Sequence, residues 1–176
     1  MSRADWKRGR FSVTEEGARI DRGLRAWQRH AGDVISWWRF SHSRSVSNDV
    51  YDEGDEGGLA YDGPWTVPVL HATHAEMGDE AGDRGLYTVD TLDISAVFAQ
   101  IQKVGLTQAD IHNDRYLRDR IAYDGRLFRI ERMSILGQIR RQDVIVSISA
   151  VEVKPDEITA DSVFAQYIPA PGAGDR

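Results

Sequence analysis

Acidic residues gather in one short stretch of this 176-residue chain, and their spacing decides which chemistry they could support. The stretch contains Asp49, Asp52, Glu53, Asp55 and Glu56. An EF-hand calcium loop needs ligands two residues apart, a glycine at position six and a bidentate glutamate at position twelve. Counted from Asp49, position six is Gly54, but position three is a tyrosine and position twelve is an alanine. The stretch does not match that motif, and we expect a solvated acidic loop.

His71 and His74, with Glu76 near them, are the residues most suggestive of a metal pair. A zinc site needs three or four ligands, and the familiar protease motif places two histidines four residues apart on a helix. Here the two histidines end a predicted strand, where a spacing of three points them to opposite faces. We therefore expect no metal site. A metal-dependent hydrolase that uses this pair and the acidic stretch is the alternative from another functional class.

Nucleophilic and phosphate chemistry find no support in the sequence. It has no cysteine and no G-x-S-x-G elbow. The glycine-rich residues 54–58 are acidic and would repel a phosphate group rather than hold it. Carboxylates such as Asp119 and Glu131 are too numerous for counting to identify an acid–base pair. We predict that the protein is not an enzyme, uses no cofactor and acts by assembling with other proteins.

Arginine and tryptophan are the residue types that favour contacts with partners. Residues 115–141 are rich in arginine, which either pairs across strands on a solvated face or binds carboxylates at an interface. Trp37 and Trp38 cannot both face the core of one strand, so one of them meets a partner or a covering helix. The expected interface anchors are Trp6, Trp37, Trp38, Trp65, Arg126, Phe164 and Tyr167.

Charge is distributed unevenly along the chain. Residues 1–44 carry a net charge of +5, residues 49–83 carry −10 with no lysine or arginine, and the whole chain carries −6. Such separation creates regions of opposite potential that either dock charged neighbours or are simply solvated. The overall acidity argues against tight binding to duplex DNA. The apolar runs are too short for a membrane span, and no secretory signal is expected.

The residue pattern predicts one mainly β (α+β) domain. We expect a small β-barrel- or sandwich-like fold with peripheral helices, a long acidic loop and extended termini. Residues 1–14 are expected to form a flexible basic arm, 15–157 the domain and 158–176 an extended tail. Within the domain, an apolar stripe at positions 20, 24 and 27 predicts a helix over 15–30.

Strands are expected on both sides of the long loop. Bulky residues predict a strand over 34–40, and the loop then spans 41–63. A second strand is expected over 66–72, where Pro68 favours an edge position. Residues 86–91 alternate as a strand does. Asp93 is then the expected N-cap of a short helix through Ile101, and 107–113 should add a helical turn.

The C-terminal third predicts a three-stranded meander. Its strands are expected over 118–123, 127–135 and 143–153, with turns at 123–125 and Gly137. Asp124-Gly125 between two strand-like runs is a strong hairpin signal. The last strand is apolar on both parities, which favours a central place in the sheet.

Two stretches carry a family resemblance. The first is S-N-D-V-Y-D-E-G-D at 47–55 with P-W-T-V-P-V at 64–69, and the second is R-D-R-I-A-Y-D-G-R-L-F-R-I at 118–130, followed by Gly137 and a strand ending in E-V-K at 154. Together they resemble the head-to-tail connector proteins of tailed phages, in particular the stopper (head-closure) type of long-tailed actinobacterial phages. The resemblance covers roughly 37–157, and the D-x-I-x-Y-D-G part is shared by several connector and tail-completion families.

This resemblance implies a virion protein of the neck, made in the host cytoplasm, that forms a ring of six or twelve copies. Its partners would be portal or adaptor proteins and tail terminator or tail-tube proteins, and double-stranded DNA would pass through the ring without sequence recognition. In such stoppers a long loop projects into the channel and closes it after packaging. Residues 41–63 occupy that place, so their acidic side chains would repel DNA. Residues 1–30 match no part of the family, which leaves adaptor and tail-completion roles open.

Overall fold

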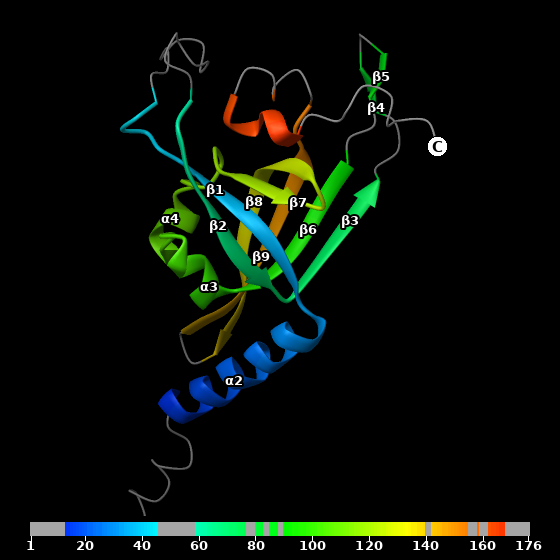
Figure 1. Cartoon of the computed structure of the whole chain (residues 1–176). Helices are drawn as coiled ribbons and strands as arrows, with labels where there is room; N and C mark the ends of the chain where they lie inside the picture. Colours follow the sequence, from blue (N-terminus) through cyan, green and yellow to red (C-terminus); the bar gives the residue numbers. More distant parts are fainter. Residues whose placement is uncertain are drawn as a thin grey trace, which may run out of the picture.

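A seven-stranded antiparallel sheet forms the body of the protein, in the order β2-β1-β7-β8-β9-β6-β3 (Figure 1). The computed structural model describes residues 13–45, 59–76, 80–82, 85–87, 90–139, 142–154, 158 and 162–167. The strands are β1 (Asp33–Phe40), β2 (Tyr61–Val69), β3 (His71–Glu76), β6 (Asp90–Val97), β7 (Arg120–Tyr123), β8 (Arg126–Ile139) and β9 (Gln142–Glu152).

The two edge strands of this sheet, β2 and β3, are consecutive in the chain and are separated by Leu70 alone. The Leu70 N–H donates to the carbonyl of Ser95 on β6 (2.8 Å), so the corner is fastened to the far half of the sheet. The sheet curls until its edges meet at this corner, but it stays open. The predicted mainly β fold with peripheral helices is confirmed, and the sheet is not a closed barrel.

Short helices surround the sheet. They are α2 (Val13–Ala31), α3 (Phe98–Lys103), α4 (Gln108–His112) and the 3-10 helix η1 (Ser162–Tyr167), while β4 (Glu80–Gly82) and β5 (Gly85–Tyr87) form a separate hairpin. The predicted helices over 15–30 and 107–113 are confirmed as α2 and α4. A capping box starts α4, in which Thr107 Oγ1 accepts from the Asp110 N–H (3.2 Å) and Asp110 accepts from the Thr107 N–H (2.9 Å). No helix in the described ranges has the length and apolarity to cross a bilayer.

The predicted helix that begins at Asp93 is wrong. Residues 90–97 form β6, and the alternate residues Leu92, Ile94 and Ala96 are buried. The helix begins only at Phe98, so the shared face that the sequence suggested combines the end of a strand with the first turns of α3. Strand pairing with both β3 and β9 overrides the helical spacing here.

Two turn predictions also need correction. Gly137 lies inside β8, where the register with β9 shifts on both sides of it, so it marks a bulge rather than a turn. The loop predicted over 41–63 ends earlier, because Tyr61 pairs with Phe40 and opens β2. The strand predicted over 66–72 is divided at Leu70 between β2 and β3, and the edge position expected from Pro68 is confirmed.

Two apolar clusters lie on opposite faces of the sheet. The inner cluster includes Trp37, Ile35, Ile121 and Phe128, and α3 and α4 add Phe98, Ile101 and Ile111 to it. The outer cluster contains Trp38, Phe40, Tyr61, Ala122, Leu127, Val153, Ile158 and Phe164. Adjacent strand residues point to opposite faces, which is why Trp37 and Trp38 belong to different clusters. The segment predicted as an extended tail therefore contributes Ile158 and Phe164 to a buried cluster.

The hairpin between β7 and β8 turns at Asp124-Gly125, as predicted. Both residues have positive φ, 48° and 75°, which is the geometry of the tight turns that match strand twist. Aspartate tolerates this conformation and glycine adopts it without strain. The central position of β9, between β8 and β6, is also confirmed.

Candidate functional site

Asp119 is a fully buried carboxylate at the start of β7. Its Oδ2 accepts a hydrogen bond from Trp37 Nε1 (3.0 Å), and its Oδ1 accepts one from the backbone N–H of Phe40 (2.9 Å). Arg39 forms an ion pair with Oδ2 through Nε (3.0 Å) and donates from Nη1 to the carbonyl of Val104 (3.2 Å). The carboxylate therefore ties β7 to β1 and, through Arg39, to the end of α3.

Burial raises the pKa of Asp119 to about 6, although the Phe40 N–H and the Arg39 and Trp37 donors oppose this rise. All the polar atoms around it are donors from the sheet itself. The role of this arrangement is structural, because it holds β7 and β1 together.

A second polar cluster combines His74 on β3, Asp90 on β6, Arg126 on β8 and Glu152 on β9. His74 Nε2 lies 3.0 Å from Asp90 Oδ2, and Arg126 pairs with the same oxygen. Arg126 also lies 3.6 Å from Glu152. These residues share the inward parity of Leu92 and Phe128, so they close one end of the inner core with charged groups.

The electrostatics of this second cluster are set by burial. Burial raises the pKa of Glu152, the nearby Arg126 lowers it, and the neighbouring Asp90 carboxylate raises it again. Beside the cluster, the Tyr123 hydroxyl donates to Asp33 Oδ2 (2.5 Å), which raises the pKa of Tyr123 to about 12 and lowers that of Asp33. Arg126 lies between the carboxylates of Asp90 and Glu152, and these partly neutralise its charge.

The histidine pair does not converge on one point. His71 lies on the exposed face and contacts Thr73 Oγ1 (2.6 Å), whereas His74 turns to the inner face and Asp90. The opposite orientation expected from their spacing is confirmed, although His71 begins β3 and His74 lies in its middle, so the pair does not end a strand. In the described ranges no group of three or more His, Cys, Asp or Glu side chains is arranged to hold a metal ion.

The expected interface anchors have different environments. Trp37, Trp38 and Phe164 are buried in the two apolar clusters, so they fill the chain's own core and are not exposed to a partner. Trp38 and Phe164 meet edge to face (5.4 Å between ring centroids), and Tyr167 packs on the same ring. Trp65 on β2 is 37% exposed, and Arg126 belongs to the polar cluster. Trp6 and the acidic positions Asp49, Asp52, Glu53, Asp55 and Glu56 lie outside the described residues.

The D-x-I-x-Y-D-G motif is explained residue by residue by the fold. Asp119 ties β7 to β1, Ile121 is buried in the inner cluster, and Tyr123 binds Asp33 at the start of β1. Asp124 and Gly125 make the turn. The motif therefore fastens the hairpin to β1, which is a structural role that any function built on this fold would need.

The free side of β2 is protected from pairing. Pro64 and Pro68 lie on this strand and lack an N–H to donate. The carbonyl of Pro68 accepts from Gln28 Nε2 (2.6 Å), and the carbonyl of Leu70 accepts from Trp27 Nε1 (3.3 Å). Side chains of α2 thus occupy the outward carbonyls at the end of this edge, and another strand cannot add there.

The free side of β3 has none of these protections. Its sequence, H-A-T-H-A-E, contains no proline. β6 pairs with one side of β3, and the other side is the free edge of the sheet. Neither β3 nor β6 contains lysine or arginine, while the two strands contain Glu76, Asp90 and Asp93. Asp93 is exposed on the outer face opposite Thr73. Among the described residues, β3 is therefore an edge strand without these protections, with acids in its sequence and in that of β6; it forms the right-hand edge of the sheet in Figure 1.

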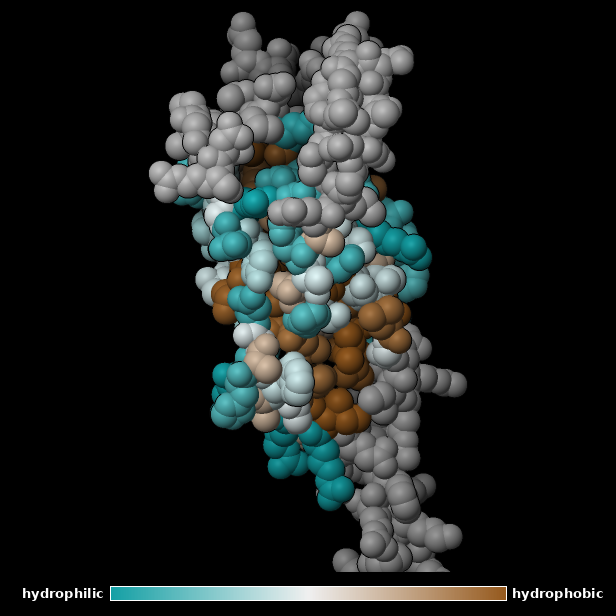
Figure 2. Space-filling model, turned by 90° about the vertical axis from the view of Figure 1, so that its right-hand side faces the viewer, coloured by the Kyte–Doolittle hydropathy of each residue, from teal (hydrophilic) through white to brown (hydrophobic). Residues whose placement is uncertain are grey.

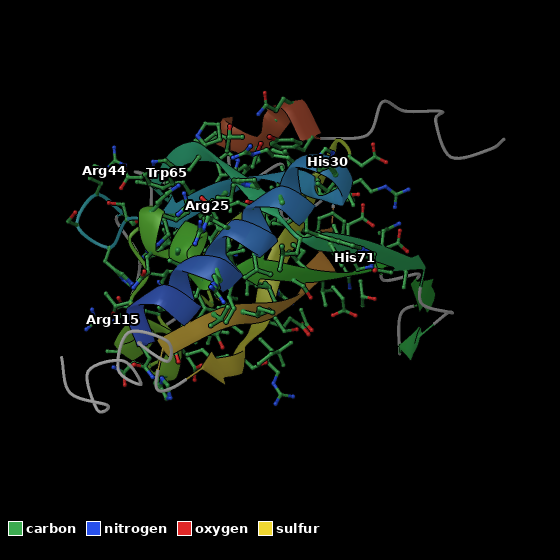
Figure 3. The ribbon with its side chains drawn as sticks, turned by 90° about the horizontal axis from the view of Figure 1, so that it is seen from below. Arg25, His30, Arg44, Trp65, His71 and Arg115 are labelled. Atoms are coloured by element: carbon green, nitrogen blue, oxygen red, sulfur yellow. The ribbon has the colours of Figure 1, made fainter. Side chains whose placement is uncertain are left out.

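Helix α2 lies outside the core. Seen from below, it crosses the underside of the sheet from the side of Arg115 to that of His30, with Arg25 near its middle (Figure 3). Ile20 and Leu24 on its apolar stripe are only partly buried, and Trp27 is 60% exposed. Trp27 and Gln28 fasten its C-terminal end to the Pro68–Leu70 corner. Hydrophobic residues also gather on the lower half of the surface shown in Figure 2.

The two buried carboxylates, Asp119 and Asp90, had a signal in the sequence that residue counting missed. Asp119 has the same strand parity as Ile121, and Asp90 has that of Leu92 and Ile94, so each falls on a buried face. A charged residue at an inward position is expected to be paired, and both are. The partners, however, come from distant strands that only the fold brings together.

Comparisons with known proteins add little to these observations. No protein-family model matches the sequence, and no curated protein matches it either. A solved structure described as the virion of a native gene transfer agent particle is similar in fold, with a TM-score of 0.42 and 16% identity. The similar region covers 69% of this chain and 94% of that one. A likeness of this degree does not bear on function.

Proposed function

We propose that this protein is a structural component of a virion that forms a ring at the head-to-tail interface. The observation that carries the proposal is an architecture with surfaces left for partners: an open sheet with one unguarded edge, and a helix that stands outside the core. The resemblance to phage connector proteins at 47–69 and 118–154 supplies the kind of assembly. The buried carboxylates Asp90 and Asp119, in contrast, are paired within the chain, as in a protein whose interior serves stability.

Electrostatics supports repeated assembly of like subunits. The first 44 residues carry +5, whereas residues 49–83 carry −10. Opposite charges at different places on one chain favour a head-to-tail contact between copies over a contact of identical patches. Such heterologous contacts close into a ring when the rotation between copies allows it.

Native mass spectrometry and negative-stain electron microscopy test the ring. We expect the purified protein, alone or with the portal and tail proteins encoded beside it, to form closed rings of uniform copy number. The rings should weaken as salt increases, because exposed charges are screened. Monomers alone, at every concentration and with every neighbour, would contradict the proposal.

The stopper role is the more specific part of the proposal and rests on the resemblance. A variant that lacks residues 49–58 should still fold and form rings, but particles assembled with it should lose packaged DNA. The measurement is DNA retained per particle after nuclease treatment. Full retention with intact rings would favour an adaptor or tail-completion role. A variant that fails to fold would show that the segment is structural.

A further inference from the structure

The contrast between the two sheet edges identifies a docking site. Natural proteins often block sheet edges with proline, with lysine or with a covering element, because an open edge recruits other strands. The β2 edge has two prolines and two carbonyls held by α2. The β3 edge has no proline, and the described residues do not cover it.

Charge limits what this edge can accept. The strands β3 and β6 have acids and no lysine or arginine, and residues 76–83 add Asp79, Glu80 and Asp83 to the sequence next to them. The nearest described cation, Arg126, is already paired with Asp90. An acidic edge favours a basic segment, and residues 1–12 carry Arg3, Lys7, Arg8 and Arg10 against a single acid, Asp5.

Helix α2 determines where this basic arm is delivered. The C-terminal end of α2 is fastened beside Leu70, where β3 begins. The 19 residues of the helix place its first residue about 28 Å from that point. Twelve residues span at most about 40 Å when extended. To reach its own β3 edge, the arm would have to run back along the whole helix, and only about 12 Å of its extended length would then remain to pair with that edge.

We propose that the β3 edge binds the basic N-terminal arm, residues 1–12, of a second copy of this chain. The contact is heterologous: each copy offers its arm to one neighbour and its edge to the other. Main-chain hydrogen bonds to the edge supply affinity, and Glu76 in the sequence of β3 and the exposed Asp93 of β6 favour a basic arm. This inference rests on the proposed function, since it names the surface through which the ring would close.

Disulfide trapping tests the contact, and the chain has no native cysteine to interfere. Protein with Thr73→Cys on β3 is mixed with protein with Gly9→Cys, oxidised mildly and run on a non-reducing gel. The matched control replaces Thr73→Cys by Thr66→Cys, an exposed threonine on the guarded β2 edge. We expect at least tenfold more covalent dimer with Thr73→Cys than with Thr66→Cys. Equal yields would overturn the inference.

Two further results separate the alternatives. A chain that carries both Gly9→Cys and Thr73→Cys should give covalent multimers; an internally linked monomer would show that the arm binds its own edge and would overturn the inference. Replacing Arg3, Lys7, Arg8 and Arg10 by glutamine in the full chain should lower the yield of Thr73→Cys dimer by at least fivefold, and an unchanged yield would overturn the charge argument. If the wild-type protein forms rings but the cysteine variants form no covalent dimer, this contact alone is refuted. If no oligomer forms at all, the proposed function is refuted.

Discussion

Two adjacent tryptophans on β1 show how differently the two faces of the sheet are built. Trp37 is completely buried in the inner cluster, and its indole N–H donates to Asp119. Trp38 is buried in the outer cluster against Phe164, and its indole nitrogen has no acceptor among the described residues. One strand thus serves two cores. The inner core is assembled by the sheet and α3 and α4, while the outer core depends on a segment that returns from beyond β9.

This difference means that the inner face sets the stability of the sheet and the outer face sets the attachment of the C-terminal segment. A polar network in the inner core ties β1 to β7, because Trp37, Arg39 and Phe40 on β1 all contact the Asp119 carboxylate. The outer core is held by edge-to-face aromatic contacts, by buried apolar area and by cation–π contacts of Arg118 with Phe40 and of Arg120 with Tyr61. Substitutions on the two faces should therefore differ in size and in the region that they release.

The largest effect is expected from Asp119→Asn. The amide would place an N–H group where Oδ2 now accepts from Trp37 and faces Arg39, so two donors would lose their acceptor and the free energy of unfolding should fall by about 3–5 kcal/mol. Urea denaturation measures the change. Asp124→Asn removes the same charge at an exposed turn position that asparagine tolerates, and it should change stability by less than about 0.5 kcal/mol. Similar losses in the two variants would remove the special role of the inner network.

Phe164→Ala and Phe128→Ala compare equal truncations on the two faces. Both phenylalanines are buried, the first in the outer cluster and the second in the inner cluster. Phe128→Ala should cost about 3–5 kcal/mol of global stability. Phe164→Ala should cost about 2–3 kcal/mol, because the C-terminal segment can detach while the sheet stays folded.

Limited proteolysis followed by mass spectrometry distinguishes these two outcomes. In the Phe164→Ala variant, cleavage between 154 and 167 should become much faster while β1 to β9 resist. In the Phe128→Ala variant, all regions should become sensitive together. If all regions became sensitive together in both variants, the two faces would unfold as one unit.

The smaller effect of a single hydrogen bond separates Trp37→Phe from Trp38→Phe. Both changes remove the same ring atoms, but only the first removes a hydrogen bond to the buried Asp119 carboxylate. Trp37→Phe should therefore be less stable than Trp38→Phe by about 1–3 kcal/mol. If the denaturant midpoint falls equally in both variants and the slope of stability against denaturant is unchanged, the Trp37–Asp119 hydrogen bond adds no net stability.

The smallest effect is a pH dependence that only the inner face should show. The pKa of Asp119 is about 6 in the fold against an ordinary value of 3.8, so the folded state binds this proton more tightly than the unfolded state. Stability from this group is greatest below the unfolded value and is lost as pH rises towards 6. Lowering pH from 7 to 5 should add about 1 kcal/mol.

The pH effect must be measured as the difference between wild type and Asp119→Asn, because burial also raises the pKa of Glu152 in the same direction. In Asp119→Asn, the stability gained between pH 7 and pH 5 should be smaller than in wild type by about 1 kcal/mol, and the remaining gain comes from other groups. A variant with the same pH profile as wild type would assign the whole dependence to other groups.

Local chemistry predicted much of the fold. Alternation and bulky side chains identified β1, β7 and β9, Asp124-Gly125 identified the hairpin, and the apolar stripe identified α2. The errors arose where spacing was ambiguous. Ile94, Val97 and Ile101 fit a helical face as well as a strand that runs into a helix, and only pairing with β3 and β9 decides between them.

The candidate site was much harder to anticipate. Asp119 and Trp37 are 82 residues apart in sequence, and Arg126 and Asp90 are 36 apart, so no local pattern links them. Tryptophan content suggested partner contacts, but the fold buries Trp37 and Trp38 on opposite faces. The difference between the guarded and the unguarded edge depends on the order of strands in the sheet, which no single segment encodes.

The cover that Phe164 provides for Trp38 has a consequence for synthesis on the ribosome. Every strand of the sheet precedes Phe164 in the chain, so the sheet can emerge and pair before its outer aromatic face is protected. During that interval Trp38, Phe40 and Leu127 form an exposed apolar surface, prone to aggregation, on the nascent polypeptide. Translation rate and chaperone access over the stretch after β9 would then influence how much protein escapes aggregation.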